Sequence, residues 1–490
     1  MNTTPSPVLI RQLMDQSGVR FGTSGARGLA ADMTAPVCFA YTAAFLQVVA
    51  PPAGGRVALG LDLRPSSPHI AGACAAAIRH AGLIPDFCGV LPTPALAYYA
   101  QERGMPAIMV TGSHIPFDRN GIKFYRATGE ISKADEAGIA AATLALPANI
   151  RPDPLPEADP AARELYMRRY LEFFPAGILT GLRLGFYEHS SVARDLLRGL
   201  LEALGAQVTS LGRTDQFVPI DTEAVSEEDA ARARRWAREY GFDALLSTDG
   251  DADRPLLGDE RGEWLRGDVV GILCAQYLGA RAVATPVSSN TALEACGAFP
   301  RVARTRIGSP YVIEGMETLA EAEASGVVGY EANGGFLVGS EVVRDGRRLA
   351  PLPTRDAVLP ILALLAMSRE RGVPLSRLPA GLPPRFTASD RLRDFPVEDS
   401  QRLLRVLDGS AETLADFLAP LALRAARVDR TDGLRVFLDR GEIVHLRPSG
   451  NAPELRCYAE ADTPGRAGEL AAACLARVAN WREGTAATSA

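Results

Sequence analysis

The stretch RVALGLDLRPSSPHIAGACAAAIRHAGLIPDFCGV, residues 56–90, indicates the fold class. It contains an apolar segment at 56–63, a Pro-Ser-Ser-Pro turn, an Ala-rich segment that ends near His80, and a second apolar segment at 84–90. A strand, a helix and a further strand in this order are typical of a βαβ unit, which builds mostly parallel sheets. The stretch therefore predicts an α/β protein.

The same alternation returns further along the chain. A strand predicted at 182–187 precedes a helix at 192–204, and a strand at 242–248 follows a helix that begins near Ser226. A third run begins near Gly267. We therefore expect three α/β units in series.

Two proline-rich stretches divide the chain. Residues 149–160 and 372–384 each contain four prolines, which remove backbone donors and disfavour a helix in the preceding residue. Beyond the second stretch, a helix at 400–418 and a hairpin-like pattern at 434–446 predict a smaller α+β domain. The expected domains are 1–160, 161–262, 263–375 and 376–490.

Composition excludes several classes of protein. The 490 residues include 52 Lys and Arg against 58 Asp and Glu, a net charge of −6, whereas a general nucleic-acid binder has a basic excess. No apolar run reaches the ~20 residues of a membrane-spanning helix, and the N-terminus lacks a secretory pattern. The seven cysteines have no metal-binding spacing and are expected to be reduced thiols. These features predict a cytoplasmic protein with no membrane or nucleic-acid partner.

An acidic segment, DGDADR at 249–254, directly follows the strand-like FDALLST. Its carboxylates at Asp249, Asp251 and Asp253 can converge on a hard cation, because Mg²⁺ and Ca²⁺ favour oxygen ligands. An EF-hand is excluded, since Arg254 occupies the position of the turn glycine and a strand precedes the loop. With three protein oxygens, Mg²⁺ that is shared with a phosphate fits better.

A serine segment, TGSHIPFDRNGIK at 111–123, follows another short strand. Ser113 lies at the junction of strand and loop, where its hydroxyl can be a nucleophile, although loop serines often only cap helices. A serine hydrolase would need a GxSxG elbow, which the chain lacks. We also expect that His114, as the immediate neighbour, does not place its imidazole against the Ser113 hydroxyl.

Three more segments have polar or glycine-rich character, and each is also compatible with an ordinary turn. FGTSGARG at 21–28 has one cation, Arg27, and matches neither a Walker A nor a dinucleotide motif. EANGG at 331–335 offers a carboxylate and an amide that can hold sugar hydroxyls. RPSGNAPELR at 447–456 has two arginines around a Ser-Gly-Asn turn, a pattern that can hold a phosphate.

Taken in this order, the five segments resemble the α-D-phosphohexomutase superfamily, most of all its phosphomannomutase/phosphoglucomutase-type members. The resemblance implies an α/β fold: three related α/β domains with mixed sheets plus a C-terminal α+β phosphate-binding domain around a central cleft. It also implies reversible phosphate transfer between the 1- and 6-positions of a hexose, through a phosphoserine and a hexose 1,6-bisphosphate, which also acts as activator. The implied partners are hexose phosphates, and the protein is expected to be a monomer or homodimer.

The resemblance assigns roles residue by residue. Ser113 would carry the phosphate, and Mg²⁺ would be held by that serine together with Asp249, Asp251 and Asp253. The other implied catalytic residues are Arg27, His114, Lys123 and Arg254. The implied sugar-binding residues are Gly308, Glu331 and Asn333. The implied phosphate-binding residues are Arg447, Ser449, Gly450, Asn451 and Arg456.

The chain departs from the superfamily at the sugar loop. Many members have Glu-x-Ser-Gly-His where this chain has EANGG, and Ser309 stands where another histidine is frequent. The chain most resembles the phosphomannomutase-type members, which implies mannose phosphates as substrates, with phosphoglucomutase and phosphoglucosamine mutase as alternatives. A phosphosugar-binding regulatory protein is an alternative of another class, but such a protein would be expected to lose Ser113 or part of the Asp triplet.

Overall fold

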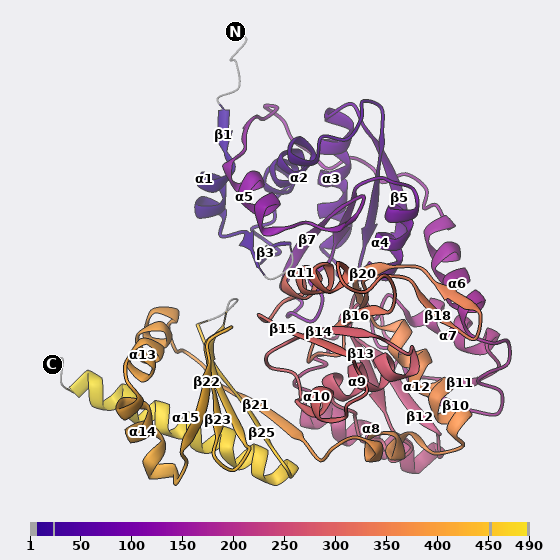
Figure 1. The fold of residues 1–490 in the computed structure, drawn as a ribbon. Helices are drawn as coiled ribbons and strands as arrows, with labels where there is room; N and C mark the ends of the chain where they lie inside the picture. The colour runs from indigo at the N-terminus through magenta and orange to yellow at the C-terminus, as the bar shows by residue number, and fades with distance from the viewer. Residues whose placement is uncertain (1–6, 23–24, 450–452, 488–490) are drawn as a thin grey trace.

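The computed structural model of the chain describes residues 7–22, 25–449 and 453–487. Figure 1 shows the N-terminal α/β unit above the next two units, with the C-terminal unit beside them. Each unit is built on its own sheet. The predicted fold class is therefore confirmed, and its first three units share one strand pattern.

The first sheet shows this pattern. Strand β4 (Arg56–Leu61) pairs in parallel with β5 (Ile84–Val90) and β6 (Ala107–Val110), and β6 pairs antiparallel with β7 (Arg119–Arg126). The other strands of this unit are β1 (Pro7–Leu9), β2 (Arg20–Phe21), β3 (Ala26–Leu29), β8 (Gly129–Glu130) and β9 (Thr143–Ala145). Its helices are α1 (Ile10–Ser17), α2 (Ala35–Val49), α3 (Ser67–His80), α4 (Thr93–Glu102) and α5 (Lys133–Ala141).

The second sheet has the same arrangement. Strand β10 (Arg183–Tyr187) pairs in parallel with β11 (Gln207–Leu211) and β12 (Ala244–Thr248), and β12 pairs antiparallel with β13 (Pro255–Gly258). The helices of this unit are α6 (Ala161–Phe173), α7 (Arg194–Ala203) and α8 (Glu227–Tyr240). As predicted, α8 begins next to Ser226, whose hydroxyl caps the helix by accepting from the Asp229 N–H at 3.1 Å.

The third sheet repeats it once more. Strand β14 (Ala282–Pro286) pairs in parallel with β15 (Arg301–Thr305) and β16 (Val327–Tyr330), and β16 pairs antiparallel with β17 (Phe336–Val338). The remaining strands are β18 (Val342–Arg344), β19 (Arg347–Leu349) and β20 (Leu352–Asp356), of which β20 pairs with β17. The helices are α9 (Gly267–Tyr277), α10 (Ala292–Ala295), α11 (Ser309–Ala320) and α12 (Val358–Arg371).

The repeated pattern places three sequence motifs at equivalent positions. The serine segment follows β6, the acidic segment follows β12, and EANGG follows β16. In every unit this strand is parallel to the central strand and is followed by an antiparallel partner. Ligands of open α/β sheets bind beyond the carboxyl ends of such strands. Each α/β unit therefore contributes one loop to a potential site.

The C-terminal unit is an antiparallel sheet with helices. Its strands are β21 (Phe386–Leu392), β22 (Ala425–Asp429), β23 (Leu434–Leu438), β24 (Ile443–Pro448) and β25 (Leu455–Ala461). Its helices are α13 (Val397–Gly409), α14 (Ala411–Leu418), the short 3₁₀ helix η2 (Ala419–Leu421) and α15 (Pro464–Ala487). The predicted hairpin is confirmed as β23 and β24, which pair antiparallel.

Two predictions of local structure need correction. The single helix expected at 400–418 is broken at Ser410, which is extended at φ −154° and ψ 155° and caps α14 through the Thr413 N–H at 3.0 Å. The connection expected at 372–384 contains a 3₁₀ helix, η1 (Leu375–Gly381). Proline excludes a regular α-helix interior but is compatible with this tighter turn, because the ring only fixes φ and removes one donor.

The apolar core divides the molecule differently from the sheets. One core cluster extends from Ala58 to Leu378 and includes residues of all three α/β units, whereas the C-terminal unit has its own cluster. The first three units therefore form one packed body. All seven cysteines are free thiols, as predicted. Among the described residues, no helix is both long and apolar enough to cross a bilayer.

Because two histidines, His189 and His445, are buried, we expect the free energy of unfolding to fall in acid. Burial lowers the pKa of His189 and of His445 to about 4 from 6.5. Above pH 6.5 the two histidines are mostly neutral in the folded and in the unfolded chain. As pH falls from 6.5 towards 4, they bind protons in the unfolded chain but not in the folded chain, so the free energy of unfolding falls. We expect a loss of about 2 kcal/mol per histidine at pH 5.

Urea unfolding at pH 7.5 and pH 5 measures this loss. His445→Gln removes one titrating group, so the variant should lose about 2 kcal/mol less than wild type over the same interval. An equal loss in both proteins would contradict the prediction. The free energy of unfolding is taken from the transition of the C-terminal unit, because that unit has a separate core.

Candidate active site

The serine loop and the acidic loop meet in the structure. The Ser113 hydroxyl donates to Asp249 Oδ2 at 2.6 Å, although the two residues lie 136 positions apart. Both side chains are fully buried. The contact joins the ends of β6 and β12, the equivalent strands of the first two units. It brings together the two segments that the sequence singled out for a nucleophile and a metal.

The three aspartates present oxygens that suit a divalent cation. Ligand atoms of Asp249, Asp251 and Asp253 lie within 4.8 Å of one another. The Oδ1 atoms of Asp251 and Asp253 are buried and have no hydrogen-bond partner among the described residues. Lys123 Nζ donates to the Oδ2 atom of each at 2.7 Å. Lys123 thus holds one oxygen of each carboxylate, while the other oxygen of Asp253 lies 3.6 Å from Arg254 Nε. An oxygen-only set of this kind fits Mg²⁺.

Buried carboxylates and neighbouring cations oppose one another in setting the pKa values of this cluster. Burial and the nearby Asp253 and Asp251 charges raise the pKa of Asp249 well above its ordinary value. Burial alone would also raise the pKa of Asp253, but Arg355, Lys123 and Arg254 hold it well below its ordinary value. A positive ion relieves the repulsion among buried carboxylates. The charges therefore favour a cation in the same place as the two aspartate oxygens that lack hydrogen bonds among the described residues.

The backbone of the serine loop adopts an unusual conformation that a buried arginine stabilises. Ser113 has φ 53°, in the left-handed region that few non-glycine residues occupy. The Arg64 guanidinium donates to the carbonyls of Ser113 at 2.9 Å, Ile115 at 2.6 Å and Pro116 at 2.6 Å. It also stacks 3.9 Å from the centre of the Phe217 ring of the second unit. Arg64 therefore holds the loop that presents the hydroxyl.

His114 contradicts one expectation. Its Nδ1 lies 3.3 Å from the Ser113 hydroxyl, so the adjacent imidazole does reach that oxygen, because the left-handed turn at Ser113 brings the two side chains together. Arg254 Nη1 lies 2.5 Å from the same nitrogen. Arginine can only donate, so Nδ1 accepts from Arg254. Burial, then Arg254 and Arg27, lower the pKa of His114 well below its usual range. The imidazole is therefore neutral and is not free to accept the Ser113 proton.

Positive side chains surround the serine and acidic loops. The Asp251 and Asp253 charges outweigh burial and raise the pKa of Lys123. The pKa of Arg27 is lowered to about 10, mainly by burial and then by Arg254 and Arg355. Lys123 is thus a firmly charged group.

The sugar loop joins this cluster through an arginine. Glu331 Oε2 accepts from Arg355 Nη1 at 2.9 Å, and Arg355 also binds Asp253 of the acidic loop. Asn333 Oδ1 accepts from the Gly335 N–H at 2.9 Å, so its amide is turned into its own loop. Among the described residues of this loop, Glu331 is the one that Arg355 links to the aspartate cluster.

The remaining predicted residues lie towards the C-terminal unit. Gly308, at φ 131°, precedes α11, and the neighbouring Ile307 N–H donates to Asp432 Oδ2 at 2.9 Å. Arg447 Nε lies 2.9 Å from the same Asp432 oxygen. Asp432 therefore ties the Gly308 loop to Arg447, a link that no sequence motif indicated.

The phosphate segment is only partly described. The Ser449 N–H donates to the Glu454 carbonyl at 2.8 Å, and Arg456 Nε lies 4.0 Å from Glu454 Oε2. Arg456 also lines a cavity of about 390 Å³ together with Glu223 of the second unit. Gly450 and Asn451, predicted phosphate ligands, lie outside the described residues.

Comparisons with known proteins identify the family. Sequence profiles of phosphoglucomutase/phosphomannomutase match its alpha/beta/alpha domain I at residues 18–148, its domain III at 266–386 and its C-terminal domain at 396–477. A phosphomannomutase from Salmonella muenchen is 49% identical over 454 residues, which cover 92% of this chain and 94% of that protein. The chain belongs to the phosphoglucomutase/phosphomannomutase family.

Two further matches agree with this assignment. A phosphomannomutase from Sinorhizobium fredii is 46% identical over 476 residues, which cover 94% of this chain and 98% of that protein. The crystal structure of a phosphoglucomutase/phosphomannomutase family protein from Burkholderia thailandensis superposes with a TM-score of 0.70 at 20% identity, covering 93% of this chain and 96% of that one. That likeness concerns the fold alone. The resemblance to the α-D-phosphohexomutase superfamily is confirmed, and the chain is of the phosphomannomutase type.

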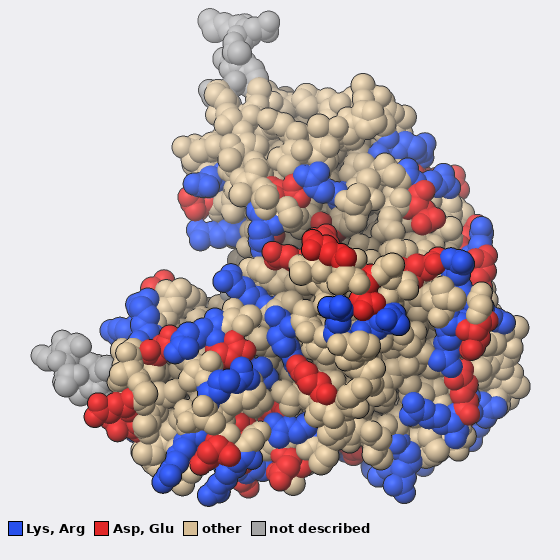
Figure 2. Space-filling model, in the orientation of Figure 1, with Lys and Arg blue, Asp and Glu red and all other residues tan. Residues whose placement is uncertain are grey.

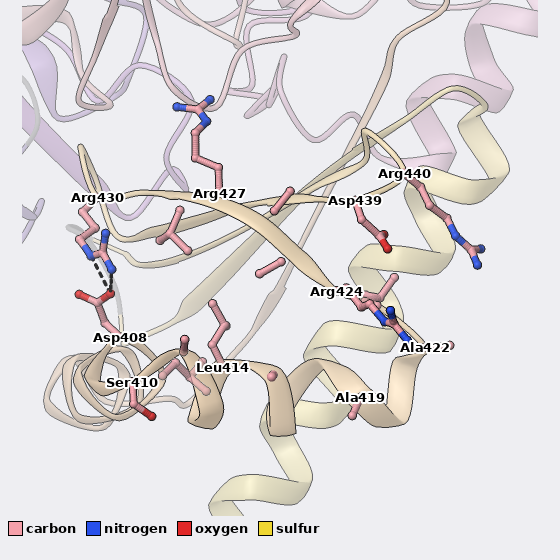
Figure 3. A pocket seen from close by; sticks show the side chains of 17 residues that line it. Asp408, Ser410, Leu414, Ala419, Ala422, Arg424, Arg427, Arg430, Asp439 and Arg440 are labelled. Carbon is pink, nitrogen blue, oxygen red and sulfur yellow. Dashed lines mark hydrogen bonds and ion pairs between the residues drawn. The ribbon is translucent and has the colours of Figure 1, made fainter.

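One large groove of this phosphohexomutase does not lie at the predicted site. A groove of about 1000 Å³ lies between α13, α14 and β22 of the C-terminal unit. Figure 3 shows that Arg427 points away from it, and Arg430 is paired with Asp408 at 2.6 Å. None of the predicted site residues that are described lines this groove. Figure 2 shows another hollow, between the N-terminal and C-terminal units, with Lys and Arg side chains on both sides.

Proposed function

We propose that this isomerase of the phosphomannomutase type interconverts mannose 6-phosphate and mannose 1-phosphate, with Ser113 as the phosphate carrier and a hexose 1,6-bisphosphate as intermediate and activator. The observation that carries the proposal is the buried contact of the Ser113 hydroxyl with Asp249, beside two aspartate oxygens that have no hydrogen bond among the described residues. The two relatives at 49% and 46% identity, both named phosphomannomutase, support mannose as the hexose.

The proposed metal site uses the three aspartates. Asp249, Asp251 and Asp253 would hold Mg²⁺ together with the phosphate on Ser113, and their buried oxygens fit that ion. When bound, Mg²⁺ supplies positive charge that withdraws electron density from the phosphate oxygens. The chain itself holds these carboxylates in place through Lys123, which donates to two of them.

Phosphate transfer needs positioning and positive charge more than covalent work by the protein. In the proposed step, a sugar hydroxyl attacks the phosphorus, the bond from Ser113 Oγ to phosphorus breaks, and a new oxygen–phosphorus bond forms on the sugar. The proton that the sugar hydroxyl loses is balanced by the proton that Ser113 Oγ gains as it becomes a hydroxyl again. Arg254 and Arg27 would stabilise the transferring group. Lys123 stays protonated because its pKa is raised, so we assign it charge stabilisation rather than the role of a base. Asp249 would stabilise the returning serine hydroxyl, to which it is hydrogen-bonded.

The second half of the proposal concerns the other end of the sugar. The intermediate has two phosphates and must turn, so the site needs a second phosphate position that accepts either end. We assign this position to Arg447, Ser449, Gly450, Asn451 and Arg456. Glu331, Asn333 and Gly308 would bind the sugar between the two positions. Closure of the C-terminal unit, which has its own core, would exclude water that could hydrolyse the phosphoserine.

The test compares kcat/KM for mannose 1-phosphate, glucose 1-phosphate and glucosamine 1-phosphate, with Mg²⁺ and a hexose 1,6-bisphosphate present. We expect mannose 1-phosphate to be preferred by about tenfold or more, the discrimination that differently placed hydroxyl groups produce. A preference for glucose or glucosamine would assign the chain to one of the two alternative mutases. Binding of all three without turnover would instead support the phosphosugar-binding regulatory protein.

A further inference from the structure

Strand β20 ends in Thr354, Arg355 and Asp356, where the three α/β units meet. All three side chains are only 2% exposed. Thr354 donates to Glu130 of the first unit at 2.8 Å, and Asp356 accepts from Tyr166 of the second unit at 2.6 Å. The strand itself belongs to the third sheet. This short segment therefore holds the three units together with side-chain hydrogen bonds.

Arg355 is the member of this segment that reaches the proposed active site. Its Nε and Nη2 atoms donate to Asp253 Oδ2 at 3.1 Å and 2.9 Å, and Nη1 donates to Glu331 Oε2 at 2.9 Å. Asp253 Oδ1 stays without a hydrogen bond among the described residues. One guanidinium thus holds a carboxylate of the acidic loop and a carboxylate of the sugar loop.

The sugar loop is shaped around this side chain. A Cβ atom at Gly335 would lie 2.6 Å from Arg355 Cδ and 2.8 Å from its Cγ, so only glycine leaves room for the arginine stem. The guanidinium is planar and has donors in a rigid fork, whereas a lysine ammonium is a single point charge. A lysine can bind two carboxylates through its one nitrogen, as Lys123 does, but it cannot hold them as far apart as the two ends of a guanidinium do. The geometry depends on arginine.

We propose that Arg355 is a positioning residue that fixes the metal-binding Asp253 and the sugar-binding Glu331 relative to each other. The proposal rests on the proposed function, since that function gives the two carboxylates their roles. Arg355 acts through these two residues and does not itself touch the reacting atoms. Its removal is therefore expected to weaken metal binding and sugar binding together.

Arg355→Lys tests the proposal by binding rather than by turnover. Mn²⁺ affinity is measured by electron paramagnetic resonance on the full chain without sugar. Affinity for mannose, glucose and glucosamine 1-phosphates is measured by calorimetry in a Ser113→Ala background, where no turnover occurs. We expect both affinities to fall by about tenfold or more, as for other residues that orient metal ligands. If R355K does not fold, R355Q, which keeps an amide donor, replaces it.

Arg169→Lys is the matched control. Arg169, on α6, is also buried, at 5% exposure, and donates to the Ala350 carbonyl at 2.7 Å rather than to Asp253 or Glu331. R169K should lower the melting temperature without changing either affinity. If R355K behaves in the same way, or loses only one of the two affinities, the proposal is overturned.

A double-mutant cycle with Glu331→Gln adds a measurement, the coupling between the two substitutions in hexose phosphate affinity, that would be zero if Arg355 had a purely structural role. In the presence of Arg355, E331Q should weaken hexose phosphate binding several-fold more than it does in R355K, because Glu331 is no longer held in place in R355K. Equal losses would overturn the proposal. The Mn²⁺ measurement and the use of three sugars separate this result from the proposed function: a wild-type chain that does not turn over mannose phosphate would refute the function and leave the test of Arg355 intact.

Discussion

Ser113→Ala is expected to lower mutase turnover by about 10⁴-fold or more and to leave the fold intact. The variant loses the oxygen that would accept and return the phosphate, while its backbone can keep the conformation that Arg64 holds. Turnover of mannose 1-phosphate and intact mass are the two measurements. The mass of the wild type should include a phosphate that the variant lacks.

Ser132→Ala is the control for this variant. Ser132 is an exposed serine of the same unit that caps α5, where it accepts from the Asp135 N–H at 3.2 Å. Its loss should cost about 1 kcal/mol of stability, as is typical of a helix cap, and should not change turnover. Full turnover in S113A, or a phosphate that remains on that variant, would refute the covalent mechanism.

Asp251→Asn is expected to have the second largest effect, a loss of about 10²-fold in turnover together with a shift of the Mg²⁺ titration to higher concentration. The substitution removes one charge from the proposed metal site. It also puts an amide where Asp251 Oδ2 now accepts from Thr93 at 2.6 Å and from Lys123 at 2.7 Å. Metal titrations of turnover and direct Mn²⁺ binding measure the two parts of the effect.

Asp259→Asn is the matched control for the metal site. Asp259 is also buried, at 5% exposure, and accepts from the N–H groups of Arg261 at 2.9 Å and Glu263 at 3.0 Å in a turn after β13. D259N should change the free energy of unfolding and leave the Mg²⁺ concentration for half-maximal turnover unchanged. A metal titration of D251N that coincides with wild type would contradict the ligand assignment.

Local sequence patterns predicted much of the fold. The βαβ alternation at 56–90 is realised as β4, α3 and β5, and the strands before the serine, acidic and sugar segments all exist. These predictions succeed because hydrophobic periodicity, turn residues and helix caps act over a few residues. The prediction of one helix at 400–418 was wrong because local signals also end helices: one capping serine, Ser410, divides the segment into two. Domain boundaries and oligomeric state stay predictions.

The residues that the sequence missed act over long distances. Arg64 stands in LDLRPSS and Arg355 in LPTRDAVLP, where each looks like an ordinary charged residue beside a strand. Their partners lie 49 and 102 positions away, at Ser113 and Asp253. Neither pattern marks a buried arginine, because burial of a charge depends on which carboxylates and carbonyls the fold brings around it. Asp432, which joins Arg447 to the Gly308 loop, was missed for the same reason.

The sequence by itself determined the α/β units, the order of the five motifs and the membership of the superfamily, because each depends on residues that are neighbours in the chain. Tertiary structure alone decided that the Ser113 hydroxyl donates to Asp249 and that His114 Nδ1 accepts from Arg254. It also decided that Arg355 joins the acidic loop to the sugar loop. The physical reason is the repeated sheet pattern. It gathers the ends of three equivalent strands, so groups that are distant in sequence share one buried environment and set one another's charge and position.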